Sequence, residues 1–342
     1  MSFKQVSKWL AFGLAIFISA CSSEPELLAL QGRTMGTSYH VKLVSTDQVS
    51  LPDDLKAELD RRLELVNDQM STYRPDSELS RFNASRSTEP FEVSAATAVV
   101  VREALRIGEL SQGQYDVTVG PLVNLWGFGP DQRPQSVPSA EQLTAIRARV
   151  GQDKLSVGER SLQKATADLY VDLSSIAKGW GVDVLADYLE TLGVTSYMVE
   201  IGGELRTAGK KPDGQPWRIA IEKPDPSGQR AIQEVLAPGD NGLATSGDYR
   251  NYYEEDGVRY SHTINPATGR PIDHRLASVT VIHPSAMTAD GLATAINVLG
   301  EEAGWALAER EQLAVFMVIK TDEGFKERYT TAFEKYLVEA PQ

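Results

Sequence analysis

Asp290 and Thr294 are the residues whose types and spacing point most directly to chemistry. They lie four apart in Ser285–Gly300, SAMTADGLATAINVLG, and on a helix this spacing places both side chains on one face. A carboxylate and a hydroxyl are hard oxygen ligands that suit Mg²⁺, which takes one or two carboxylates with phosphate oxygens and water. The pattern also fits an ordinary buried helix, in which Thr288 is the N-cap, Asp290 favours the helix dipole and Gly300 ends the helix.

A second candidate for phosphate binding lies at residues 169–185. The run LYVDL, residues 169–173, predicts a short strand that leads through serines into a helix, with Asp172 ending the strand and Lys178 at the helix start. Lysine binds phosphate as a point charge, and an aspartate can bond a ribose hydroxyl or a ring N–H. A capped strand–helix connection with a solvated lysine fits equally well. The glycine spacing excludes a Walker loop and a G-x-G-x-x-G fingerprint.

The four histidines form no zinc motif such as H-E-x-x-H, and the serine-hydrolase motif G-x-S-x-G is absent. His262 lies just before the turn Asn265–Pro271, where it can assist proton transfer or stabilise charge. A structural histidine bonded to a turn carbonyl accounts for it as well.

Periodic apolar residues predict the elements that position these groups. Leu55, Leu59 and Leu63 are spaced as on one face of a helix over 53–70, and Ser139 with Gln142 forms a capping box for a helix over 140–150. Further helices are predicted over 94–113 and 301–311, and strands over 196–201, 217–222, 258–264, 277–283 and 313–319. Helices and strands alternate irregularly and form hairpins, which predicts an α+β fold rather than a doubly wound sheet.

The composition bears on the class of partner, and the N-terminus indicates where in the cell the protein is located. The chain has 342 residues and a net charge of −13, which argues against a nucleic-acid-binding surface. Lys4 and Lys8 precede an apolar run, residues 9–20, that ends ISAC at Cys21, the only cysteine. This predicts a lipoprotein signal peptide over 1–20, a lipid-modified Cys21 and a polar tether over 21–34. A plain signal peptide with an incidental cysteine is the alternative.

Several loops are rich in Gly, Ser, Thr and Asp. Their order along the chain resembles that of the ApbE family of FAD:protein FMN transferases. The resemblance covers about residues 32–335, includes the lipobox, and implies a single domain over 35–338 with mixed or antiparallel sheets packed by helices. Its motifs are MGT from Met35, STY to Tyr73, YDVTVGP from Tyr115, DLSSIAKG from Asp172, GG at 202–203, TSG at 245–247, SH to His262, NPATG from Asn265 and AD at 289–290 through Thr294.

The resemblance implies that the protein splits FAD, attaches FMN to a Thr or Ser of a target protein and releases AMP. It implies Mg²⁺ bound by Asp290, Thr294 and the backbone carbonyls of Ser175 and Ala293. The residues implied to line the FAD site are Met35, Tyr73, Gln114, Tyr115, Asp116, Asp172, Lys178 and Ile264. Some relatives carry an acidic residue in place of Lys178 or Ala293, so the charge at the metal varies within the family.

The general base stays open between Asp290 and His262. Two other activities need the same site: a metal-dependent FAD pyrophosphatase that yields FMN and AMP, and a periplasmic FAD-binding protein without catalysis. The resemblance also implies targets in sodium-pumping NADH:quinone reductase or Rnf-type complexes. It implies a membrane lipoprotein that faces the periplasm, and it leaves open which bacterial membrane holds the anchor.

Overall fold

A computed structural model describes residues 25–47, 49–130, 137–223, 232–247, 252–255 and 257–338. The signal segment and Cys21 lie outside these residues. Within the described ranges, no helix is both long enough and apolar enough to cross a membrane.

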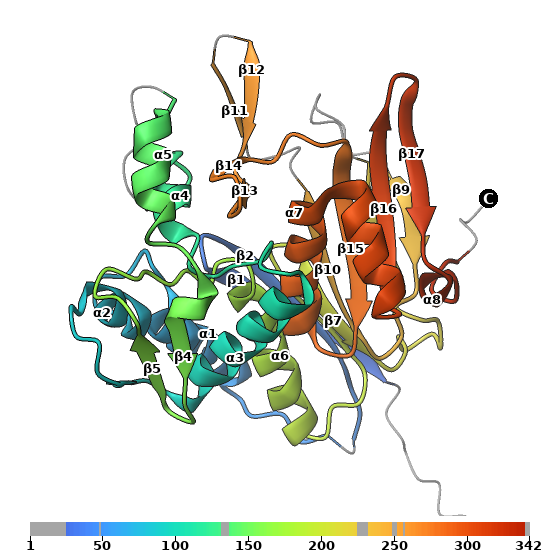
Figure 1. The fold of residues 1–342 in the computed structure, drawn as a ribbon. Coiled ribbons are helices and arrows are strands. Elements are labelled where there is room, and N and C mark those ends of the chain that lie inside the picture. The colour runs from blue at the N-terminus through green and yellow to red at the C-terminus, as the bar shows by residue number, and fades with distance from the viewer. Residues whose placement is uncertain are drawn as a thin grey trace, which may run out of the picture.

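An eight-stranded sheet forms the centre of the molecule (Figure 1). Every neighbouring pair of its strands is antiparallel. In spatial order the strands are β1 (Glu26–Thr34), β2 (Thr37–Ser45), β6 (Tyr197–Ile201), β7 (Glu204–Ala208), β10 (Gly242–Gly247), β15 (Leu276–His283), β16 (Ala314–Thr321) and β17 (Gly324–Tyr329). β15 is buried along nearly its whole length, and β16 is buried over residues 314–318, which explains why the predicted strand 313–319 reads as a continuous apolar run.

Four long helices pack around this sheet: α1 (Leu55–Met70), α3 (Ala95–Leu110), α6 (Ala177–Thr191) and α7 (Ala286–Arg310). α7 packs against β10, β15 and α6, while α6 also packs against β6, β7 and α1. Leu59 and Leu63 of α1 are buried with Leu185 and Leu189 of α6 in one core. The periodicity that predicted α1 therefore marks its buried face.

The opposite side of β10 and β16 is covered by a hairpin and a short helix. β8 (Ile219–Glu222) pairs with β9 (Ile232–Leu236), and α8 (Thr331–Glu334) follows β17. Ile221, Phe316 and Phe333 are buried together there.

Smaller elements complete the fold. α2 (Glu78–Ala84), β3 (Phe91–Glu92), the 3₁₀ helix Gln152–Lys154, β4 (Leu155–Val157) and β5 (Ser161–Lys164) lie beside α3. A separate cap contains α4 (Gly120–Leu125), α5 (Ala140–Arg147), β11 (Tyr252–Glu255), β12 (Val258–Ser261), β13 (Ile264–Asn265) and β14 (Arg270–Pro271). Figure 1 shows the cap standing above α3 and α7. Trp126 ties it together by donating from Nε1 to the Gly269 carbonyl at 2.8 Å.

The α+β prediction is confirmed, as are the helices predicted for α1, α3 and α5. The capping box of Ser139 and Gln142 is present. Gly300 has φ 78° and breaks α7 where the sequence predicted a helix end.

Three local predictions are wrong. Residues 26–34 form strand β1 instead of a tether, because their backbone pairs with β2 over nine residues. Residues 169–173 form no strand, since the Val171 backbone bonds to the Asn83 side chain and the Asp172 N–H to the Val117 carbonyl. The N-cap of α7 is Ser285, whose side chain accepts from the Thr288 N–H.

Candidate active site

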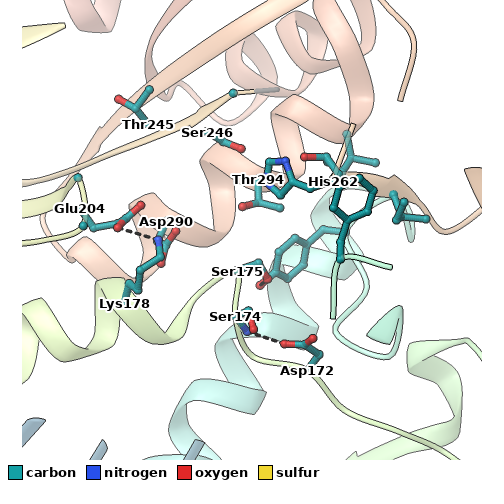
Figure 2. A pocket seen from close by; sticks show the side chains of 18 of the residues that line it. Asp172, Ser174, Ser175, Lys178, Glu204, Thr245, Ser246, His262, Asp290 and Thr294 are labelled. Carbon is teal, nitrogen blue, oxygen red and sulfur yellow. Dashed lines mark hydrogen bonds and ion pairs between the residues drawn. The ribbon is translucent and has the colours of Figure 1, made fainter. Parts of the chain in front are cut away.

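A cavity of about 670 Å³ opens between the start of α6, the first turns of α7, the end of β10 and the cap. Its volume is in the range of small-molecule and cofactor sites. Figure 2 shows the polar side chains that converge on it.

The first turns of α7 are held by a carboxylate from α6. Asp183 accepts hydrogen bonds from the Ser285 hydroxyl at 2.7 Å and from the Ala286 and Met287 N–H groups, each at 3.0 Å. A negative charge at these unpaired donors stabilises the helix start. Asp183 thus fixes the end of α7 that carries Asp290.

α6 and α7 approach each other so closely that one position must be glycine. A Cβ added at Gly179 would lie 2.4 Å from the Ala286 carbonyl oxygen. The Gly179 N–H donates to Oδ2 of Asp290 at 3.0 Å. The AKG sequence at the start of α6 therefore allows the backbone to reach the buried carboxylate.

Asp290 lies in a cluster with Lys178 and Glu204, in which both carboxylates are buried and Lys178 is partly exposed. Burial, opposed in part by the charge of Lys178, raises the pKa of Asp290 to about 7. Nζ of Lys178 is 2.7 Å from Oε2 of Glu204, as Figure 2 shows. Burial alone would lower the pKa of Lys178, but the carboxylates of Glu204 and Asp290 raise it. With both carboxylates ionised, this cluster has a net charge of −1.

This cluster fits a divalent cation. Asp290 is 5% exposed and its charge is not matched within the cluster, while Thr294 lines the same cavity one turn later. Among the described residues, no three His, Cys, Asp or Glu side chains gather as metal ligands. One carboxylate with neutral oxygens, completed by phosphate and water, is the donor set that Mg²⁺ favours.

The other wall is aromatic and polar. Tyr73 is 64% exposed at the mouth, and the Tyr115 ring is buried below it with its hydroxyl accepting from Ser175 Oγ at 2.9 Å. Oδ1 of Asp172 accepts from the Ser174 N–H at 2.8 Å, which fixes the loop before α6. This wall offers ring faces and hydrogen-bonding groups to a flat ligand.

His262 lies where the cap meets the cavity. Its ring centroid is 6.3 Å from that of Phe128, in an edge-on arrangement. Phe128 in turn stacks on Tyr253 at 5.4 Å. The aromatic packing thus places an imidazole at the cavity on the side of the cap.

The structure brings most of the predicted site residues together. Those lining the cavity are Tyr73, Gln114, Tyr115, Asp116, Asp172, Ser175, Lys178, His262, Ile264, Asp290 and Thr294. Two others lie outside its lining. Met35 is at the β1–β2 turn with φ 49° and packs beside Gly181, and Ala293 is buried on α7.

Sequence reasoning missed Glu204 and Asp183. Glu204 begins β7 directly after the Gly202–Gly203 turn, and an acidic residue opening a buried strand was the available signal. Asp183 lies in the apolar middle of α6 and is 5% exposed. A charged residue on the buried face of a helix signals a specific partner.

Comparisons with known proteins show which family this chain is similar to. The FAD:protein FMN transferase of Vibrio cholerae serotype O1 is 56% identical over 96% of this chain and 98% of its own length. That of Haemophilus influenzae is 48% identical over 97% of this chain and 98% of its own. The solved flavin transferase ApbE from Vibrio cholerae has a TM-score of 0.86, with 56% identity, over 92% of this chain and 100% of its own. The ApbE family model matches residues 35–317, and this protein belongs to the ApbE family.

Proposed function

We propose that this protein transfers the FMN part of FAD to a Ser or Thr hydroxyl of a target protein and releases AMP. The observation that carries the proposal is the buried Asp290 carboxylate beside Thr294 in a cavity of cofactor size. This site lies in a chain similar over nearly its full length to FAD:protein FMN transferases.

The cavity walls suit the two chemical parts of FAD. The ring faces of Tyr73 and Tyr115 match flat aromatic groups. Lys178 lies next to Asp290 and supplies positive charge for the diphosphate. Asp172, fixed by its bond to the Ser174 N–H, accepts from a ribose hydroxyl or a ring N–H.

We also propose a Mg²⁺ ion at the start of α7. Asp290 and Thr294 would hold it through side-chain oxygens, and Ser175 and Ala293 through backbone carbonyls. When bound, the ion neutralises charge on the diphosphate and on the departing AMP. Asp290 is already oriented for this role by the Gly179 N–H.

The transfer is a displacement at phosphorus. The acceptor hydroxyl oxygen forms a bond to the phosphorus of the FMN half, and the bond from that phosphorus to the bridging oxygen breaks. AMP leaves with the bridging oxygen and its electron pair, and the hydroxyl proton passes to a base. His262 and Asp290 both line the cavity as candidate bases. Positioning and charge neutralisation provide most of the rate in such reactions.

We further propose that the chain is a lipoprotein anchored through Cys21 and facing the periplasm. The apolar run that ends at Cys21 supports this. An anchor would keep the enzyme near membrane-bound acceptors, for which subunits of sodium-pumping NADH:quinone reductase and Rnf-type complexes are the candidates.

Intact-mass spectrometry tests the transferase. The soluble domain, without residues 1–21, is incubated with FAD, Mg²⁺ and an acceptor domain from such a subunit, while AMP is followed in parallel. We expect the acceptor to gain the mass of one FMN, and EDTA or an acceptor Thr→Ala substitution to prevent it. Free FMN with AMP and an unmodified acceptor would instead indicate a pyrophosphatase, and bound FAD without AMP a binding protein.

A further inference from the structure

Strand β10 has neighbours on both sides only at its start. It pairs with β15 along its whole length, whereas β7 pairs with it only at Gly242 and Leu243. Continuing that register would place Thr245 opposite Gly203, but Gly203 belongs to the turn before β7. In the described part of the chain, no strand pairs with Thr245–Gly247 on the side away from β15. We call Thr245–Gly247 the open edge of β10.

The open edge presents backbone groups in a known direction. The Asn241 carbonyl accepts from the Thr207 N–H at 3.0 Å, so the backbone of Asn241 faces the β7 side. Successive residues of a strand direct their N–H and C=O groups to alternate sides. The N–H and C=O groups of Thr245 and Gly247 therefore face the β7 side of β10, beyond the point where β7 pairs with it.

The side chains of this edge are already engaged. Oγ1 of Thr245 is hydrogen-bonded to Oγ1 of Thr280 at 2.7 Å. Oγ of Ser246 accepts from Nδ2 of Asn297 at 3.2 Å. These bonds hold the strand from its two faces, and they leave the backbone as the part of the open edge that can bind a ligand.

The open edge lies in the same cavity as the chemistry. Thr245, Ser246 and Gly247 line it together with Asp290 and Thr294, and Figure 2 shows the strand running alongside α7. A Cβ added at Gly203 would meet no atom within 4 Å. The space next to the open edge is the cavity that Thr245, Ser246 and Gly247 line.

We propose that an extended segment of the acceptor protein pairs with the open edge as an added strand and so delivers its hydroxyl to the site. This inference rests on the proposed transferase function. Strand addition uses backbone hydrogen bonds, and pockets for alternate side chains add selectivity. Because side chains alternate between the two faces of a strand, one residue of the segment faces α7, Asp290 and Thr294 while its neighbours face away.

A polypeptide matches this edge better than FAD does. The edge offers N–H and C=O groups of residues two apart, the repeat that another strand's backbone complements. The ring faces that suit the flavin or adenine lie elsewhere, at Tyr73 and Tyr115. The acceptor is also the substrate that has a backbone to pair.

The first test changes only the acceptor. A synthetic peptide spanning the modified Thr of an acceptor domain is prepared with a single backbone N-methyl group at each position in turn. Strand pairing predicts that kcat/KM falls about fivefold or more at the two alternate positions whose N–H groups bond to the carbonyls of Thr245 and Gly247. The intervening positions should stay within about twofold, since their N–H groups point away from β10.

The second test changes the enzyme and uses the whole acceptor domain. Thr245→Pro removes one of the two N–H groups that face the open side and leaves the N–H bonds to β15, as proline is tolerated at strand edges. Thr245→Val loses the hydroxyl but keeps the N–H, so it is the reference. We expect the KM for the acceptor to be about fivefold higher in Thr245→Pro than in Thr245→Val, with equal FAD dissociation constants and closely similar melting temperatures.

The outcomes separate the two proposals. If wild-type enzyme forms no FMN adduct on any acceptor, the transferase proposal fails and the docking proposal falls with it. If adducts form but the N-methyl effects do not alternate, only strand addition is wrong. A weaker affinity for FAD in Thr245→Pro, with the acceptor KM equal to that of Thr245→Val, would assign the edge to FAD instead.

Discussion

Asp290 couples folding to pH because its carboxyl group is buried. The pKa of Asp290 is raised to about 7, while a carboxyl in the unfolded chain loses its proton near pH 4. Between these values the metal-free folded state binds the extra proton, so the free energy of unfolding falls as pH rises from about 4 to about 7. The full effect is about 4 kcal/mol or less.

We predict that Asp290→Asn removes this dependence. In urea unfolding with EDTA, the variant should be more stable than wild type at pH 8 by about 2 to 4 kcal/mol and nearly equal to it at pH 4. Mg²⁺ should stabilise only the wild type, and transfer by the variant should fall about 100-fold or more. If the free energy of unfolding of both proteins changed with pH in the same way, Asp290 would not be the source of the pH dependence.

Glu204 keeps Lys178 from neutralising Asp290. The Lys178 ammonium is 2.7 Å from Glu204, and without that partner it becomes a counter-ion for Asp290 that competes with the metal. We predict that Glu204→Gln raises the Mg²⁺ concentration for half-maximal transfer about tenfold, equivalent to about 1.4 kcal/mol, with a smaller change in kcat.

Glu200→Gln is the matched control, because it removes the same charge from the strand before the Gly202–Gly203 turn. The Glu200 carboxylate bonds to His40 at 2.6 Å and to the Gly203 N–H at 2.7 Å. The Mg²⁺ concentration for half-maximal transfer should change by less than about twofold in this variant. Equal shifts in both variants would mean that only long-range charge matters.

At the scale of the elements, α7 depends on Asp183. Three donors at the helix start bond to this carboxylate, and Arg206 Nη1 lies 3.3 Å away. We predict that Asp183→Asn lowers the free energy of unfolding by about 1 to 3 kcal/mol, because a buried charged acceptor is lost. Urea titration measures this change in stability. In a Mg²⁺ titration, the concentration for half-maximal transfer should rise, because the start of α7 is held less firmly.

Asp187→Asn provides a control on the same helix. Asp187 bonds to Arg206 at 2.7 Å, but its side chain is 63% exposed, so its loss should cost less than about 1 kcal/mol. If both variants lose equal stability, the contribution comes from Arg206 and not from capping of α7.

Elements with local signals were predictable. The apolar spacing that buries Leu59 and Leu63 marks α1, and the Ser139 capping box marks α5. Residues 169–173 were predicted as a strand because their composition favours strands. In the structure, the side chain of Asn83, which is distant in the sequence, forms the hydrogen bonds to the Val171 backbone. Strand pairing is decided by distant residues, which local patterns do not reveal.

The site shows the same difference between residues that a local pattern predicts and residues that only packing brings together. Asp290 and Thr294 share a helix, so their spacing alone placed them together. Glu204 reaches Lys178 only because β7 packs against α6, and that packing has no local signature. The family resemblance supplied the long-range information that brought residues from the cap and the core into one predicted site.

At the scale of the whole molecule, β1 decides where the folded domain begins. Leu28 and Leu30 pack against the core shared by α1 and α6, and the buried Thr34 accepts from Asn67 Nδ2 of α1 at 3.1 Å. A domain beginning at residue 35 would lose these contacts and expose the backbone edge of β2, which favours association between chains. A domain beginning at residue 25 keeps them.

We predict that the domain starting at residue 35 is less stable than the one starting at residue 25 by about 3 kcal/mol or more, from lost leucine burial and the lost hydrogen bond. Urea unfolding at low protein concentration measures the difference, and size-exclusion chromatography should show oligomers only for the shorter protein. Both proteins lack Cys21, so the lipid anchor does not enter the comparison. A shorter protein that is monomeric and equally stable would mean that β1 is dispensable for the stability of the domain.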